Sequence, residues 1–291
     1  MAVPEFQLPS GAKLPQLAYG TGTLWIKENE ADIDRPTVDG IKLAIELGYR
    51  HLDGAQYYKT EAELGVAVKE SGVPRSEFFI STKAISPVDV EGSLRTSLQK
   101  LGMDYVDLYL IHEPFSAGGN EQVLQDAWRG MEGCLEKGLA RNIGVSNFLI
   151  PHLDAVLKIA KVKPMVNQVE LHPYLQRTQL VDYLKAQDIA IEAYAPLGPL
   201  VKARPGPIDD VTARLAEKYA VSESVILLRW VIQLGIVVIT TSGRKERLQE
   251  YLKQVPSFQL TDAEVQEISA EGKKKNYRAF FADAYGKDCF D

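Results

Sequence analysis

An acid and two phenols lie close together in residues 51–58, where a short apolar stretch ends. Asp53 is followed by Tyr57 and Tyr58, and either phenol can serve as a proton donor. A cation beside a phenol stabilises the phenolate and lowers a pKa that starts near ~10. Lys83, at the end of a later apolar stretch, is the candidate cation. By itself the motif is more simply explained by a carboxylate that caps a helix and two packing tyrosines, so its context must decide.

The elements that must position these residues alternate between two hydrophobic periodicities. Stretches typical of strands occur at 17–20, 51–53, 78–83, 106–112, 142–145, 165–170, 189–194 and 237–239. Helical periodicity occurs at 38–47, 61–71, 90–101, 123–137, 149–159, 180–187, 222–234 and from 245 onward. Such alternation implies right-handed crossovers between parallel strands. We therefore expect an α/β fold in which the sheet closes into a (β/α)8 TIM barrel.

Additional elements are expected at both ends of this alternation. Residues 6–15 alternate apolar and polar side chains about Ser10-Gly11, which predicts a β-hairpin that plugs one end of the barrel. Extra helices are predicted near the C-terminus, around 210–219 and after the capping box that begins at Thr261. With no linker or repeat in between, we expect a single domain over residues 1–291.

Composition bounds the class of protein. The chain of 291 residues is 45% hydrophobic and 25% charged, with a net charge of −6. An acidic protein of this kind is not expected to bind nucleic acid, although it can hold a local basic pocket for a phosphate. Cys134 and Cys289 match no metal or disulfide spacing, and the apolar stretch 225–239 is interrupted by Arg229 and Gln233. We expect a cytoplasmic protein, a monomer or weak dimer, with no membrane or nucleic-acid partner.

The chemistry of a TIM barrel is found at the C-terminal ends of its strands. Here almost every strand ends in a polar residue: Asp53, Lys83, His112, Ser146-Asn147, Gln168, Tyr194 and Thr241-Ser242. Taken singly, Asn147 can be a helix cap, Gln168 a buried amide and Lys83 a surface charge. Together they require partners or a ligand, because desolvating so many polar groups is unfavourable. The glycine-rich segment 20–23 lacks the Gly-x-Gly-x-x-Gly and Walker patterns, so a Rossmann domain is not expected.

The motifs at these strand ends resemble those of the aldo-keto reductase family over essentially the whole chain. They are Asp-Gly-Ala-Gln-Tyr-Tyr at 53–58, Ser-Thr-Lys at 81–83, the segment 98–112 ending in Leu-Ile-His, Gly-Val-Ser-Asn-Phe at 144–148, Asn-Gln-Val-Glu at 167–170 and Tyr-Ala-Pro-Leu at 194–197. The resemblance implies a catalytic tetrad of Asp53, Tyr58, Lys83 and His112. Physical reasoning alone leaves the choice between Tyr57 and Tyr58 open.

The resemblance also implies hydride transfer between a nicotinamide cofactor and a carbonyl compound. Tyr58 would be the general acid, helped by Lys83 and Asp53, and His112 would hold the carbonyl oxygen. Ser146, Asn147 and Gln168 would bind the nicotinamide carboxamide and Tyr194 would stack on its ring. Gly22, Thr23, Asp53 and Leu197 would line the same cleft. Cofactor-binding residues are also implied at Ser242, Arg244, Arg247 and Glu250.

The segment 241–250 predicts the choice of cofactor. Arg247 matches the arginine that grips the adenosine 2′-phosphate in the family, whereas the usual lysine is Thr241 here and Arg244 would compensate. We therefore expect NADPH, with NADH possible but weaker. Alternatively, the two arginines pair with Glu246 and Glu250 on an exposed helix, which would contribute little.

The chain departs from the family pattern at several positions, of which Glu113 concerns the substrate. Gly54, Ala195 and Glu113 replace the common threonine, serine and aromatic residue, and Thr-Thr-Ser at 240–242 is similar to a fungal branch that includes conjugated polyketone and ketopantoyl lactone reductases. Glu113 either alters the substrate mouth or points outward. The predicted mouth comprises Trp25, Tyr57, Glu113 and Phe115, with Tyr277 or Phe280 from the tail. We expect a small activated carbonyl: an aldehyde, α-diketone or keto-lactone.

Two other classes of function use similar residues. A metal-dependent barrel hydrolase requires a close histidine pair on one strand, which the four histidines do not provide, so no metal site is expected. A nicotinamide-binding redox sensor without significant turnover, as the potassium-channel β subunits of the family are, would share the rim residues. The intact tetrad favours an enzyme.

Overall fold

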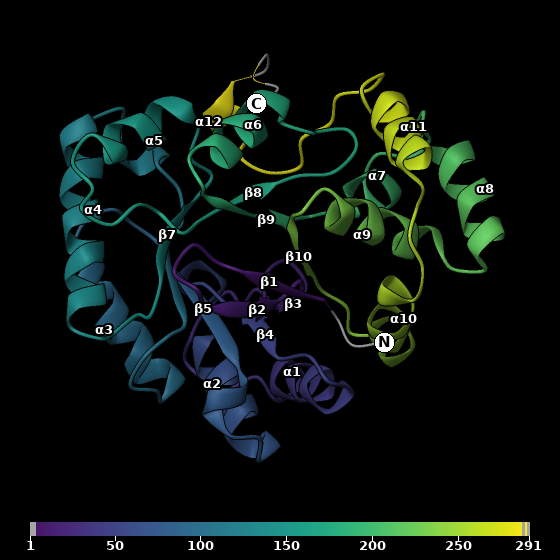
Figure 1. The fold of residues 1–291 in the computed structure, drawn as a ribbon. Coiled ribbons are helices and arrows are strands. Elements are labelled where there is room, and N and C mark those ends of the chain that lie inside the picture. Colours follow the sequence, from purple (N-terminus) through teal and green to yellow (C-terminus); the bar gives the residue numbers. More distant parts are fainter. Residues whose placement is uncertain (1–3, 287–288, 290–291) are drawn as a thin grey trace.

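Eight parallel strands close into a barrel in the computed structural model, which describes residues 4–286 and 289 (Figure 1). Around the barrel the order is β10-β3-β4-β5-β6-β7-β8-β9. Strands that are consecutive in the sequence are adjacent in the sheet, and the pairing of β10 with β3 closes the barrel. The predicted (β/α)8 fold is confirmed. The strands are β3 (Leu17–Gly20), β4 (His51–Asp53), β5 (Phe79–Ala84), β6 (Leu108–Ile111), β7 (Ile143–Ser146), β8 (Val166–Glu170), β9 (Ala190–Tyr194) and β10 (Val237–Thr240).

Helices cover the outside of the barrel (Figure 1). Their ends follow local signals: Asp34 caps α1 by accepting from the Thr37 amide, and Thr261 and Glu264 form the predicted capping box of α11. The α-helices are α1 (Arg35–Leu47), α2 (Glu61–Ser71), α3 (Val90–Leu101), α4 (Glu121–Glu136), α5 (Ile150–Leu157), α6 (Thr178–Ala186), α7 (Gly198–Val201), α8 (Asp209–Tyr219), α9 (Glu223–Gln233), α10 (Lys245–Gln254), α11 (Asp262–Gly272) and α12 (Ala282–Tyr285). Short 3-10 turns are η1 (Gln56–Tyr58), η2 (Arg75–Glu77), η3 (Phe115–Ala117) and η4 (Val255–Ser257).

Some boundaries differ from those predicted. The strand expected at 106–112 is shorter, because Val106 makes only an isolated bridge with Ala140 before β6 begins. Helix α4 begins earlier than expected, since the Asn120 side chain accepts from the Gln122 amide and so caps it there.

The predicted N-terminal hairpin closes one end of the barrel. Strands β1 (Glu5–Gln7) and β2 (Lys13–Pro15) pair antiparallel, and Ser10 in the turn donates to Asn142 Oδ1 at 2.6 Å. Leu8 and Leu14 pack in a buried cluster with the first residues of five barrel strands: Phe79, Leu108, Val166, Ala190 and Val237. The hairpin therefore covers the N-terminal ends of the strands and leaves the C-terminal ends for the site.

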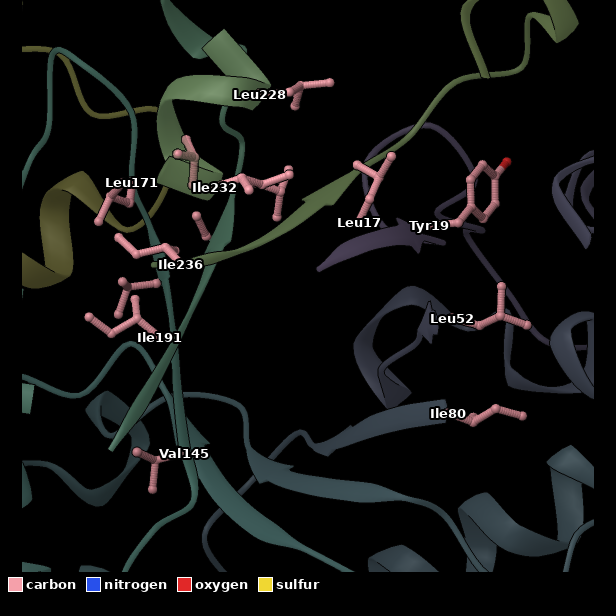
Figure 2. Packing of buried hydrophobic residues seen from close by; sticks show 14 of the residues in the cluster. Leu17, Tyr19, Leu52, Ile80, Val145, Leu171, Ile191, Leu228, Ile232 and Ile236 are labelled. Atoms are coloured by element: carbon pink, nitrogen blue, oxygen red, sulfur yellow. The ribbon is translucent and has the colours of Figure 1, made fainter. Parts of the chain in front are cut away.

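Alternation along the strands separates two kinds of interior. Leu52, Ile80, Val145 and Ile191 belong to the main apolar cluster, which also holds the inner faces of the helices (Figure 2). Their sequence neighbours point the other way, into the barrel, because successive side chains of a strand lie on opposite faces. The inward side chains of these strands include the buried polar residues His51, Asp53, Ser81, Lys83 and Glu192.

Candidate active site

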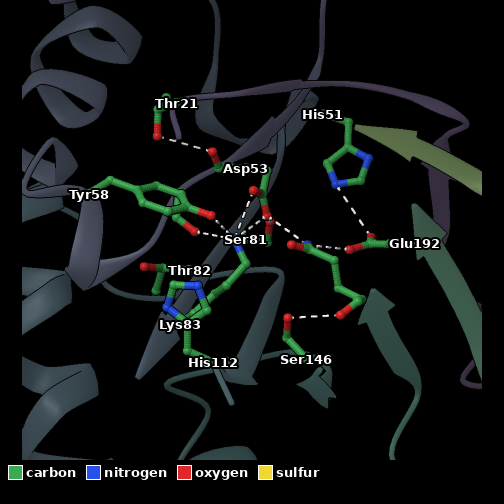
Figure 3. Close-up of polar contacts among 12 residues, drawn as sticks. Thr21, His51, Asp53, Tyr58, Ser81, Thr82, Lys83, His112, Ser146 and Glu192 are labelled. Carbon is green, nitrogen blue, oxygen red and sulfur yellow. Dashed lines mark hydrogen bonds and ion pairs between the residues drawn. The ribbon is translucent and has the colours of Figure 1, made fainter. Parts of the chain in front are cut away.

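A buried ion pair between neighbouring strands anchors the site (Figure 3). Lys83, with 0% of its side chain exposed, places Nζ 2.8 Å from both carboxylate oxygens of Asp53 and 2.7 Å from the carbonyl of Gly54. Asp53 Oδ1 also accepts from Ser81 Oγ at 2.8 Å and Gln168 Nε2 at 3.0 Å. The register of β4 on β5, which pairs Asp53 with Ser81, brings these groups together. Lys83 is thus a buried partner of Asp53 rather than a surface charge.

The structure brings Tyr58, not Tyr57, to this pair. Tyr58 Oη lies 3.4 Å from Lys83 Nζ, whereas Tyr57 is 56% exposed. Both belong to the 3-10 turn η1, where adjacent side chains point in different directions. A Cβ on Gly22 would lie 2.9 Å from the Tyr58 ring, so only glycine allows the β3 loop to approach this ring so closely.

Burial and charge oppose each other at Tyr58. Burial raises the pKa of the phenol above its ordinary value, and the nearby Lys83 ammonium lowers it by a smaller amount. The expected net lowering by Lys83 is therefore not seen, because desolvation of the phenolate outweighs the attraction of the cation. Burial would also lower the pKa of Lys83, but Asp53 reverses this and holds it raised. The result is a protonated phenol beside a charged ammonium at neutral pH.

His112 lies next to both phenols as a neutral ring. Its ring centroid is 5.7 Å from that of Tyr58 and 6.1 Å from that of Tyr57, with edge-to-face geometry in each case. Burial, and to a smaller extent the positive charge of Lys83, lowers the pKa of His112 to about 3. A neutral imidazole at this position retains one N–H for a hydrogen bond to a substrate oxygen.

Four side chains predicted to hold the nicotinamide meet at the adjoining rim. Asn147 Nδ2 donates to the carbonyl of His112 at 2.9 Å and to Ser146 Oγ at 3.1 Å, and its Oδ1 accepts from Tyr194 Oη at 2.8 Å. Ser146 Oγ donates to the carbonyl of Gln168 at 2.8 Å. Asn147 has φ of 63°, a left-handed conformation that asparagine tolerates well, so it does not act as a simple helix cap.

The loop after β10 presents exposed cations at the start of α10. The buried Ser242 accepts from the Arg244 amide through Oγ at 3.1 Å. Arg244, the residue before the helix, and Arg247 are both exposed, while Glu250 is half-buried. In the part of the chain that the structure describes, neither guanidinium pairs with Glu246 or Glu250. Among the residues described, the start of the helix therefore carries two unpaired guanidiniums beside Glu246 of the first turn, and this excess of positive charge suits an anion.

The remaining predicted cofactor residues lie in loops at the same ends of the strands. Gly22 and Thr23 follow β3, where Thr23 is exposed with φ of 55°. Leu197 precedes α7 and is half-buried against the main apolar cluster.

The predicted substrate residues do not form one group. Phe115 packs against the tail, with ring centroids 4.8 Å from Tyr285 and 5.5 Å from Phe281. Trp25 lies toward α1 and the β10 loop: its indole donates to Tyr19 Oη at 2.8 Å and lies against Gly40 and Gly243.

Glu113 is held by hydrogen bonds to the turn that follows it. Its carboxylate accepts from the amides of Phe115 and Ser116 and from the Ser116 hydroxyl, which caps the turn η3. The position of Glu113 in the substrate mouth stays a prediction, as does that of Trp25.

The C-terminal tail leads to α12, which lies near the start of α6 (Figure 1). The carboxylate of Glu170, buried at the end of β8, accepts hydrogen bonds from the amides of Ala279 at 2.7 Å and Phe280 at 3.0 Å. Phe280 places its ring 5.6 Å from that of Tyr194, and Tyr285 Oη donates to the carbonyl of Asn147 at 2.9 Å. The tail residue in contact with Tyr194 is thus Phe280, whereas Tyr277 lies beside His172.

Sequence reasoning did not single out four of these residues. His51 and Glu192 lie two positions before Asp53 and Tyr194, so strand alternation already places them on the same inward face. Glu170 lies two positions after Gln168, so it is also on the same face of its strand as that residue. Tyr285 carries no such signal, because it lies in a tail without periodicity.

Among the described residues, two further features are absent. No helix there is both long and apolar enough to cross a membrane. Within the same residues, no three His, Cys, Asp or Glu side chains are grouped so that they could hold a metal ion.

Comparison with known proteins adds independent information. Residues 16–272 match the model of the aldo/keto reductase family. The chain is 41% identical to an NAD/NADP-dependent indole-3-acetaldehyde reductase of Schizosaccharomyces pombe, covering 93% of this chain and 96% of the relative. It is 39% identical to an NADPH-dependent alpha-keto amide reductase of Saccharomyces cerevisiae, covering 97% and 95%. A Bombyx mori aldo-keto reductase solved in complex with NADP superposes with a TM-score of 0.86 at 33% identity, over 99% of this chain and 98% of that one.

Proposed function

Because this chain belongs to the aldo/keto reductase family, we propose that it reduces a small carbonyl compound to an alcohol with NADPH, using Tyr58 as the general acid. The observation that carries the proposal is the position of Tyr58 Oη beside a lysine that Asp53 holds in place. We assign this chemistry to a single domain that spans residues 1–291. Residues 1–3, 287, 288, 290 and 291 of this domain lie outside the described residues. We also propose that the protein is a cytoplasmic monomer or weak dimer.

The proton transfer follows from the arrangement of the tetrad. Carbonyl reduction leaves negative charge on the carbonyl oxygen, which needs hydrogen-bond donors aimed at it. An oxygen placed between Tyr58 and His112 would receive the phenolic proton from Oη and a hydrogen bond from the imidazole N–H. Lys83 would stabilise the phenolate that remains. Asp53 is the positioning residue that keeps the ammonium in place.

The rim residues fit a nicotinamide dinucleotide. Bound NADPH would supply the hydride to the carbonyl carbon. Ser146, Asn147 and Gln168 offer hydroxyl and amide groups for the carboxamide, and Tyr194 offers an aromatic face. The unpaired guanidiniums at the start of α10 fit the adenosine 2′-phosphate, and the exposed Arg247 matches the family's arginine at this place.

Arg247→Ala is expected to weaken NADPH binding while leaving NADH binding nearly unchanged. A charge-assisted hydrogen bond contributes about 1.5–3 kcal/mol before solvent screening, which corresponds to a preference of about tenfold or more. Titration of cofactor fluorescence gives both dissociation constants. Lys253→Ala removes a cation from the last turn of the same helix and should change neither constant. Equal losses for both cofactors, or a wild type that prefers NADH, would show that Arg247 does not read the phosphate.

The substrate proposed is an aldehyde, an α-diketone or a keto-lactone. Support comes from three aromatic rings: Tyr57 lies beside His112, Phe115 packs on Tyr285 of the tail, and Phe280 of the tail packs on Tyr194. Two of the relatives are described as reductases of an aldehyde and of a keto amide, which are carbonyl compounds of this activated kind.

Turnover with a panel of these compounds tests the function directly. The purified protein is mixed with NADPH and each carbonyl, and the loss of cofactor absorbance is followed. We expect turnover with at least one small activated carbonyl and a lower kcat/KM for long-chain or highly charged analogues. Cofactor binding with no turnover for any compound would favour the redox-sensor alternative, and a strong preference for charged substrates would contradict the proposed mouth.

A further inference from the structure

A second carboxyl group is buried in the barrel beside the tetrad, and the proposed chemistry does not use it. Glu192, on β9, is 0% exposed and its Oε2 accepts from Gln168 Nε2 at 2.9 Å (Figure 3). The same Nε2 donates to Asp53 Oδ1 at 3.0 Å. Gln168 therefore links Glu192 to the carboxylate that holds Lys83.

The other oxygen of Glu192 faces the His51 ring nitrogen that lacks a partner. Glu192 Oε1 lies 3.7 Å from His51 Nε2, and both atoms are buried without a hydrogen-bond partner among the described residues. His51 Nδ1 lies 3.1 Å from the carbonyl of Pro15, which can only accept, so Nδ1 carries the proton. Nε2 is then a bare lone pair. A proton on Glu192 Oε1 would satisfy both unpartnered atoms after a shift of less than ~1 Å.

The charges around Glu192 favour the same state. The titratable groups that face it are His51 and Asp53 on β4 and Lys83 on β5. On the two neighbouring strands, Glu192 is paired with the neutral Gln168 of β8 and with Val237 of β10. With Glu192 neutral, Asp53 and Lys83 balance each other in the dry interior. With Glu192 ionised, two buried anions would share one cation.

We propose that Glu192 is a neutral carboxylic acid in the folded protein, donating from Oε1 to His51 Nε2 and accepting from Gln168 through Oε2. The burial and charges around the two groups favour the same protonation state. Burial, followed by repulsion from Asp53, raises the pKa of Glu192 to about 7, and burial lowers that of His51 to about 4. The proton thus belongs to the glutamic acid and the imidazole is neutral.

The arrangement makes Glu192 a positioning residue for the cofactor, a consequence that rests on the proposed function. Both N–H groups of Gln168 are taken, one by Asp53 and one by Glu192. The amide cannot rotate without placing its oxygen against a carboxylate, so Oε1 is held free to accept from the nicotinamide carboxamide.

Glu192→Gln and Glu192→Leu separate the two parts of the proposal. Glutamine has the shape of the neutral acid and can keep both hydrogen bonds, whereas leucine fills the space and keeps neither. Because the raised pKa lets the native state hold a proton that the unfolded chain releases near ~4.3, wild-type stability should fall as pH rises from ~4.3 to about 7 and stay constant above that. The Tm of Glu192→Gln should therefore match wild type near or below ~pH 4 and exceed it near ~pH 8, and the infrared band of a protonated carboxyl should disappear in this variant.

Cofactor binding provides the second readout. We expect Glu192→Gln to bind NADPH within about twofold of wild type and Glu192→Leu to bind at least tenfold more weakly, which is about 1.4 kcal/mol. Equal Tm differences at both pH values with no change in the carboxyl band would overturn the neutral acid. Equal affinities of the two variants would overturn the positioning role. A wild type that fails to bind NADPH would instead reject the proposed function, and the Tm and infrared measurements would still decide the protonation state.

Discussion

Tyr58→Phe is expected to abolish carbonyl reduction while the protein still binds NADPH. The substitution removes only the hydroxyl that lies 3.4 Å from Lys83 Nζ, and a positioned general acid typically contributes 10²–10⁴-fold to the rate, so kcat should fall by roughly that factor. The phenyl ring keeps its contacts with Gly22 and His112, so folding and cofactor affinity should change little. Single-turnover consumption of NADPH measures the chemical step, and fluorescence titration measures binding.

Tyr57→Phe is the matched control for this prediction. It removes the neighbouring hydroxyl from the same turn, but Tyr57 is largely exposed and its hydroxyl makes no hydrogen bond within the described residues. Most of the activity should remain. If Tyr57→Phe were inactive and Tyr58→Phe active, the assignment of the acid would be reversed.

Lys83→Met is expected to impair both the chemical step and the stability of the fold. The ammonium opposes the rise in the Tyr58 pKa that burial causes, so its loss should raise that pKa further and slow proton donation. The loss also leaves Asp53 as a buried anion without its cation, and breaking a buried pair in this way costs about 3–5 kcal/mol. Single-turnover rates and urea denaturation measure the two effects separately.

The double variant Lys83→Met with Asp53→Asn distinguishes catalysis from folding. Removing both charges relieves the unpaired anion, so unfolding free energy should recover in part. Carbonyl reduction should remain low, because the phenol still lacks its cation. Full activity of Lys83→Met, or activity that recovers together with stability in the double variant, would remove the proposed role of the lysine in catalysis.

The site works through the conflict between burial and charge. The barrel interior excludes water, which raises the pKa values of Tyr58 and Glu192 and lowers that of His112. At neutral pH these shifts keep Tyr58 and His112 in their neutral, hydrogen-bonding forms, while Asp53 and Lys83 compensate each other as ions. A neutral acid and a neutral imidazole beside a balanced ion pair suit proton donation to a carbonyl oxygen.

The sequence by itself determined the fold and the set of strand-end residues. Helix and strand periodicities, the capping box at Thr261 and the hairpin turn at Ser10-Gly11 are local properties, and the structure confirms the elements that they predict. Strand alternation also fixes which residues point into the barrel. Asp53, Lys83 and Gln168 could therefore be assigned to one rim before their distances were known.

The tertiary structure decided what depends on contacts across the barrel or on irregular backbone. The choice of Tyr58 over Tyr57 rests on the direction of side chains in a 3-10 turn, which has no apolar periodicity to reveal it. The capping of η3 by Glu113 and the contact of Tyr285 with Asn147 likewise arise in loops. The pairing of Glu192 with His51 joins β9 to β4, which are not adjacent in the barrel, and only the closure of the sheet brings such residues within reach of one another.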